Sequence, residues 1–157
     1  MSYDSTAATL QHIKRVNELL LFAAKELMDR AVRHDASKLE SPEKECFDII
    51  TPRLAGTTYG SAFYHSTMDE FRSSIDHHQQ VNSHHPEFYY NGISGFDLFD
   101  LVEMFFDWKA ASERHNDGDI VRSIQINKER FGFSDQLAEI MSNTAERYLR
   151  IAAKDES

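Results

Sequence analysis

Apolar residues recur at every third or fourth position over most of this sequence, which is the spacing of one face of an α-helix. The first such segment runs from about Ser5 to Arg30, and its apolar residues are Leu10, Ile13, Val16, Leu20, Ala23, Ala24 and Leu27. Further helices are expected over 41–51, 66–81, 96–115, 120–131 and 134–153. The alternating pattern of a β-strand is absent from the sequence. We therefore predict an all-α fold, a compact helical bundle.

Residues typical of helix ends and turns predict several helix boundaries, and the apolar spacing predicts core positions. Ser41 and Pro42 are typical of a helix start, and Pro52 disfavours helix in the residue before it. Asn91-Gly92 indicates a turn, and Ser134 is expected to cap the last helix. The expected inward residues of the later helices are Met68, Phe71, Ile75, Leu137, Ile140, Met141 and Leu149. The helix expected over 96–115 has the strongest apolar pattern, with Leu98, Leu101, Val102, Phe105, Phe106 and Trp108.

Length and composition favour one globular domain over residues 1–157. The chain has 41% hydrophobic and 27% charged residues, as ordinary globular proteins do. No apolar run approaches the roughly 18 residues of a membrane span, and the N-terminus lacks the regions of a signal peptide. The single cysteine, Cys46, excludes an intramolecular disulfide and suggests a reducing compartment. We expect a cytoplasmic protein with no membrane partner; a homo-oligomer stays open.

The formal net charge of -9 restricts the class of partner. Binding to a long nucleic acid depends on neutralising phosphates with Lys and Arg, so the charge argues against it. A small phosphorylated substrate remains open, because a bound divalent metal reverses the sign of the local field.

Residues able to ligate a metal gather in three places. His34 and Asp35 are adjacent, Lys38 follows three residues on, and His12 lies upstream beside the apolar stripe. Four histidines fall within nine residues, at 77, 78, 84 and 85. Neutral imidazoles are good ligands for zinc, iron and manganese. From the residues alone, this stretch is either a metal site or a histidine-rich surface segment.

Three acids share one face of the helix expected over 96–115, because Asp100, Glu103 and Asp107 are spaced by three and four. Like charges at this spacing repel by a few tenths of a kcal/mol per pair. A solvent-exposed stripe is the usual explanation. The apolar residues around these acids leave little polar surface, which favours a metal or a basic partner.

The order His12, His34-Asp35, Asp107 resembles the H…HD…D pattern of the HD-domain superfamily of metal-dependent phosphohydrolases, over residues 8–131. More closely, HDxSK, HxxxNxHHPE and DLVEMFFDWKAA resemble small HD-like proteins of phages and bacteria. The HDxxK form is similar to that of HD-GYP-type enzymes, although the GYP element is missing. The dense histidine cluster departs from most nucleotidase relatives and leaves metal number and reaction class open.

The resemblance implies a role for each matching residue. His12, His34, Asp35 and Asp107 would hold a first metal. Asp35 would bridge to a second, which His78 and either His84 or His85 complete. Lys38 would bind substrate phosphate, and Glu103 would order metal-bound water or pair with a basic residue. His77 and Asn82 would orient ligands, with Asn82 also a candidate for substrate contact.

The expected function is hydrolysis of a small phosphate ester, most simply a nucleotide, by water that one or two divalent metals activate. Candidate ions are Mn, Co, Fe, Zn and Mg. Aromatic residues near the expected mouth would stack on a base or simply pack; they are Tyr59, Tyr64, Phe88, Tyr89 and Tyr90. Two alternatives stay open: an HD-type di-iron oxygenase, and a non-catalytic module that binds a nucleotide or protein.

Overall fold

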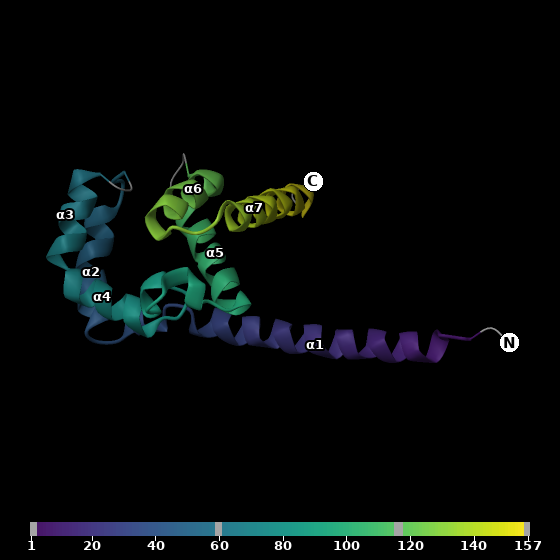
Figure 1. The fold of residues 1–157 in the computed structure, drawn as a ribbon. Coiled ribbons are helices and arrows are strands. Elements are labelled where there is room, and N and C mark those ends of the chain that lie inside the picture. Colours follow the sequence, from purple (N-terminus) through teal and green to yellow (C-terminus); the bar gives the residue numbers. More distant parts are fainter. Residues whose placement is uncertain (1–2, 59–60, 115–117, 156–157) are drawn as a thin grey trace. The chain divides into compact units, whose positions relative to one another are not determined.

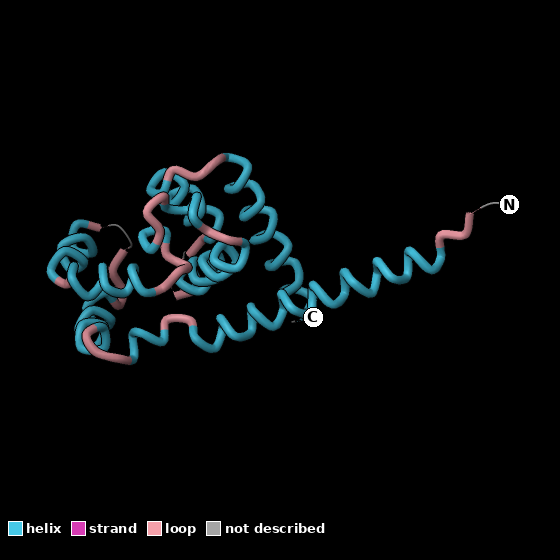
Figure 2. The backbone as a smooth tube through the Cα atoms, turned by 60° about the horizontal axis from the view of Figure 1, so that its bottom comes forward, coloured by secondary structure: helices cyan, strands magenta, loops and turns pink. Residues whose placement is uncertain are grey.

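The computed structural model describes residues 3–58, 61–114 and 118–155. Its contacts divide the chain into two units, 1–34 and 35–157. The described residues form helices and loops without a strand, so the predicted all-α class is confirmed (Figures 1 and 2). Within the described part of the chain, no helix combines the length and the apolar character that crossing a membrane requires.

The first unit is a single long helix, α1 (Thr6–Arg33). Its apolar residues follow the predicted helical spacing, and the helix continues three residues beyond the predicted end. The backbone N–H of His34 donates to the carbonyl of Arg30 at 2.8 Å and closes the last turn. No residue of α1 is buried.

The second unit begins with the short 3-10 helix η1 (Ala36–Leu39) and then α2 (Glu43–Leu54), α3 (Ala62–Glu70) and α4 (Arg72–Val81). The predicted end of the second helix at residue 51 is wrong, since α2 continues through Pro52. A proline in the last turn removes a single backbone hydrogen bond, which a helix end tolerates. The single helix predicted over 66–81 is two helices, which meet at Phe71.

Two more 3-10 helices, η2 (Pro86–Phe88) and η3 (Gly92–Gly95), form the connection that leads to α5 (Leu98–Ser112). The side chain of Asp97 caps α5 by accepting from the N–H groups of Phe99 and Asp100 at 2.7 and 2.9 Å. Gly95 allows a close approach here, because a Cβ atom at this position would lie 2.7 Å from Tyr89.

The main core lies between α5, α6 (Ile120–Phe131) and α7 (Asp135–Asp155), with α6 packed against both others. Asp119 caps α6, Gly132 ends it in the left-handed conformation (φ 67°), and the predicted Ser134 cap of α7 forms. Of the predicted core residues of the last helix, Met141 is buried, whereas Ile140 and Leu149 are exposed. Of the apolar residues of α5, Phe105 is buried, whereas Leu98 and Phe106 are exposed. The buried core consists of Met104, Phe105, Ile120, Ile124, Phe133, Ala138, Met141 and Ala145.

Candidate metal centre

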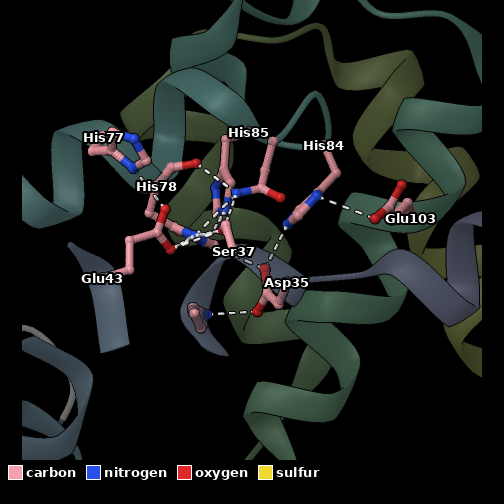
Figure 3. Close-up of polar contacts among 10 residues, drawn as sticks. Asp35, Ser37, Glu43, His77, His78, His84, His85 and Glu103 are labelled. Atoms are coloured by element: carbon pink, nitrogen blue, oxygen red, sulfur yellow. Dashed lines mark hydrogen bonds and ion pairs between the residues drawn. The ribbon is translucent and has the colours of Figure 1, made fainter. Parts of the chain in front are cut away.

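The candidate site lies within the unit 35–157, where several segments meet. η1 follows Asp35 directly and packs against α2 and α4. The last turn of α4 and the loop 82–85 supply the histidines. Figure 3 shows the histidine rings between two carboxylates, Glu43 on one side and Glu103 of α5 on the other, with Asp35 beside them.

Asp35 has a left-handed backbone, with φ 55°, a conformation that aspartate tolerates better than most residues. The Lys38 Nζ atom lies 2.5 Å from Asp35 Oδ2. Burial opposes ionisation of the carboxyl, but the neighbouring rings of His78 and His84, together with the Lys38 ammonium, outweigh it. They hold the pKa of Asp35 well below its ordinary value. Asp35 is therefore a carboxylate at neutral pH, the form that ligates a metal.

Asp35, His78, His84 and His85, here called the Asp–His cluster, each offer a ligand atom within 4.8 Å of the others. The Asp35 Oδ1 atom lies 3.2 Å from His78 Nε2 and 3.4 Å from His84 Nε2. The Nε2 atoms of His85 and His78 are 3.0 Å apart. His78 and His84 are only 4% and 2% exposed, so the surface interpretation is wrong for both.

These separations match the spacing of ligands around one ion. Nitrogen and oxygen ligands lie about 2.0–2.2 Å from zinc. Two such ligands are roughly 3 Å apart when they subtend a right angle and roughly 3.4 Å apart at the tetrahedral angle. The measured 3.0, 3.2 and 3.4 Å fall in this range. These three pairs of donor atoms are spaced as ligands of one ion are, and all four ligand atoms of the Asp–His cluster lie within 4.8 Å of one another, so they could hold a cation.

Glu43 is a fully buried carboxylate behind His78. Its Oε2 accepts from Ser37 Oγ at 2.8 Å and lies 2.8 Å from His78 Nδ1, while its Oε1 lies 2.8 Å from His77 Nδ1. Burial opposes ionisation, but hydrogen bonds from His77, Ser37 and His78 lower the pKa of Glu43. A carboxylate at Nδ1 accepts the ring proton there, which leaves the Nε2 lone pair of His78 facing Asp35.

Glu103 stands in the same relation to His84. Its Oε1 lies 3.2 Å from His84 Nδ1, and the opposite ring atom of His84 faces Asp35. Burial and the neighbouring imidazoles of His84 and His78 lower the pKa of His85 to about 3. His85 is thus a neutral imidazole at neutral pH, the form that ligates a metal.

The other two acids of the predicted stripe have separate roles. Asp100, 1% exposed, accepts from Ser83 Oγ and Tyr89 OH, both at 2.7 Å, and so ties the histidine loop to α5. Asp107 has a carboxylate oxygen within 4.8 Å of one of Asp35. The stripe of acids therefore faces the interior of this unit and combines a structural anchor with groups near the Asp–His cluster.

Most of the predicted residues within 35–157 come together. Besides the Asp–His cluster, they include Lys38, Glu103 and Asp107. Asn82 donates to Ser37 Oγ at 2.9 Å and to the carbonyl of His78 at 2.8 Å, so it joins the end of α4 to η1. Their ligand and substrate roles remain predictions. Tyr59 lies outside the described residues.

The predicted pairing of His12 with His34 on one ion needs correction. Both belong to the unit 1–34, and the uninterrupted α1 separates them by 22 residues, or about 33 Å at 1.5 Å per residue. His12 and His34 of the same chain therefore cannot ligate one ion. The part of His34 alone in a metal site remains a prediction.

Sequence reasoning missed Glu43 and Ser37. Glu43 is an acid in the first turn of α2, where a carboxylate interacts favourably with the positive end of the helix dipole. Glu43 precedes His77 and His78 by 34 and 35 residues, and no local sequence pattern connects residues that far apart.

Comparison with known protein families identifies the family of this chain. The model of a family of unknown function, DUF5662, matches residues 1–150. The chain belongs to DUF5662. Neither a curated protein nor a solved structure matches it significantly. Membership of DUF5662 carries no assigned activity, so the likeness to the HD-domain superfamily stands as a proposal.

Proposed function

We propose that this DUF5662 protein binds a divalent transition metal at the Asp–His cluster and hydrolyses a small phosphate ester, with nucleotides as the substrate class. The observation that carries the proposal is the convergence of one carboxylate and three imidazoles at ligand-to-ligand distances. When bound, such a metal lowers the pKa of water towards neutrality and supplies a nucleophile.

The donor set favours certain ions. Three imidazoles and one carboxylate suit zinc, iron, cobalt, nickel and manganese, whereas magnesium prefers an all-oxygen shell. Glu43 and Glu103 support this choice, because carboxylates at the Nδ1 atoms fix the rings of His78 and His84 and raise their basicity. We therefore expect the purified protein to carry a transition metal and magnesium to be a poor substitute.

Lys38 is suited to contact the phosphate. Its ammonium pairs with Asp35 and lies 4.9 Å from the centre of the Phe47 ring, and its side chain remains 31% exposed. The ammonium thus stands beside the cluster with access to solvent. In a protein with a net charge of -9, this cation and the bound metal would provide the local attraction for an anion.

The test begins with metal analysis of protein purified without chelator. Chelator-treated protein is then reloaded separately with Mn, Co, Fe, Zn or Mg. Phosphate release is measured with nucleoside mono-, di- and triphosphates. Hydrolysis of a cyclic nucleotide gives a nucleoside monophosphate, so those reactions are treated with a phosphatase before phosphate is measured. We expect stoichiometric transition metal and turnover of at least one small nucleotide, with single-stranded DNA left intact.

Histidine-rich donor sets also suit iron in oxygen chemistry, which makes a di-iron oxygenase the second candidate. Oxygen uptake by the iron-loaded protein, without phosphate release from any ester, would favour that alternative. Protein that binds none of the five ions with micromolar or better affinity would remove both enzymatic proposals and favour a non-catalytic binding module.

A further inference from the structure

The N-terminal helix α1 carries a surface that the proposed function does not use. Its 28 residues include large exposed apolar side chains, among them Leu10 at 61%, Leu20 at 65% and Met28 at 69% exposure. In proteins, most of the stability of a helix comes from packing of its apolar face against another element. This face of α1 therefore requires a partner.

The spacing along α1 identifies the kind of partner. One row of positions alternates steps of three and four residues over three heptads, which is the repeat of a coiled coil. The row consists of Leu10, Ile13, Asn17, Leu20, Ala24, Leu27 and Ala31. The residues that follow a step of three are Ile13, Leu20 and Leu27. Asn17 is the single polar residue of the row. A lone asparagine at such a position fixes register and helix number in paired helices.

Charged side chains lie away from this row and pair within the helix. Arg15 contacts Glu18 at 3.1 Å, and Arg30 contacts Glu26 at 3.1 Å. The row itself contains no charge, so two copies can face each other along it without like-charge repulsion. In a parallel pair Asn17 meets Asn17, where the two amides can hydrogen-bond to one another.

The available area is sufficient for a dimer. Full burial of one Leu, Ile or Met side chain removes roughly 60–120 Å² of apolar surface from water. Ten to twelve such side chains in two copies would remove roughly 600–1,400 Å², a range that includes the approximately 1,000 Å² of a specific interface. The large side chains on and beside the row are Leu10, Ile13, Leu20, Leu21, Leu27 and Met28.

We propose that α1 is a dimerisation helix that pairs in parallel with α1 of a second copy of this chain, with Asn17 against Asn17. The proposal is independent of the metal centre, because none of the residues in the row belongs to the Asp–His cluster.

The first test measures molar mass by light scattering for the full chain and two variants. Leu20→Glu places a charge in the row, whereas Phe22→Glu changes a residue that is similarly exposed, at 69% against 65%, but lies on the opposite side of the helix. We expect about twice 18.1 kDa for the wild type and for Phe22→Glu, and about 18.1 kDa for Leu20→Glu. A monomeric wild type, or a dimeric Leu20→Glu, overturns the proposal.

The second test fixes the orientation and does not depend on a disruptive charge. The only native cysteine, Cys46, is buried, so an introduced cysteine reports its own position. In a parallel pair Leu20→Cys should form an intermolecular disulfide on mild oxidation, and Phe22→Cys should not. A dimer in which Leu20→Cys fails to cross-link contradicts the parallel arrangement. A monomeric wild type whose melting temperature falls in Leu20→Glu shows that the same chain covers the face.

Discussion

The Nδ1 atom of His78 lies 2.8 Å from the buried Oε2 atom of Glu43. A carboxylate at Nδ1 favours the ring proton on that nitrogen, which leaves Nε2, the atom 3.2 Å from Asp35 Oδ1, available as a ligand. Glu43 touches none of the reacting groups we propose, and it acts on them through His78. It is a positioning residue.

Glu43→Gln should weaken metal binding by about 10–100-fold, the usual effect of losing a carboxylate behind a ligand histidine. The amide keeps the shape of the side chain but no longer has two acceptor oxygens for Nδ1–H groups. Affinity can be measured by competition with a chromogenic chelator. Glu45→Gln is the matched control, since it removes the same charge from the exposed side of the same helix turn. Equal affinity in both variants would show that Glu43 has only a structural role.

Asp35→Asn should lose most of the bound metal while the fold survives. Asparagine tolerates the left-handed backbone at φ 55° nearly as well as aspartate, so this change isolates the charge. Asp35→Ala should lose the metal and, in addition, about 1–2 kcal/mol of unfolding free energy from backbone strain. Metal content by mass spectrometry and urea unfolding separate the two effects. Full metal content in Asp35→Asn would exclude Asp35 as a ligand.

The helical periodicity of the sequence predicted the all-α class and both ends of α6, because burial of one face repeats every 3.6 residues. It failed at Phe71, where one predicted helix is two, and at Ile140, which was predicted to be in the core and is exposed. Periodicity reports which side of a helix is apolar. It does not report whether another element covers that side.

The candidate site was only partly predictable for a related reason. Neighbouring candidate ligands such as His84 and His85 stand out in the sequence, because histidines are rare and these two are adjacent. Glu43 does not, since its only local feature is a place in the first turn of α2. His12 was wrongly paired with His34, because the H…HD…D pattern gives order along the chain and not the length of an unbroken helix.

Lys38→Ala should retain the metal but reduce kcat/KM for the phosphate substrate by roughly 10–100-fold, the cost of one charge-assisted contact of about 1.5–3 kcal/mol. The loss should appear mainly in KM if Lys38 binds the ground state. Lys44→Ala serves as the control, because that lysine pairs with Asp48 on the exposed side of α2. Unchanged kinetics in Lys38→Ala would remove the lysine from the substrate site.

Asp100 anchors the loop that carries His84 and His85. It accepts a hydrogen bond from the hydroxyl of Tyr89 at 2.7 Å. Tyr89→Phe leaves this buried carboxylate with one donor fewer and should lower the unfolding free energy by about 1.5–3 kcal/mol. Tyr90→Phe should change it by less than about 0.5 kcal/mol, since Tyr90 is fully exposed.

Because the same anchor positions two residues of the Asp–His cluster, we expect Tyr89→Phe also to weaken metal binding at temperatures where the variant remains folded. Urea unfolding and chelator competition on both variants measure the two effects. Equal stability of the two variants would show that Ser83 and the backbone of Asp97 suffice to hold Asp100.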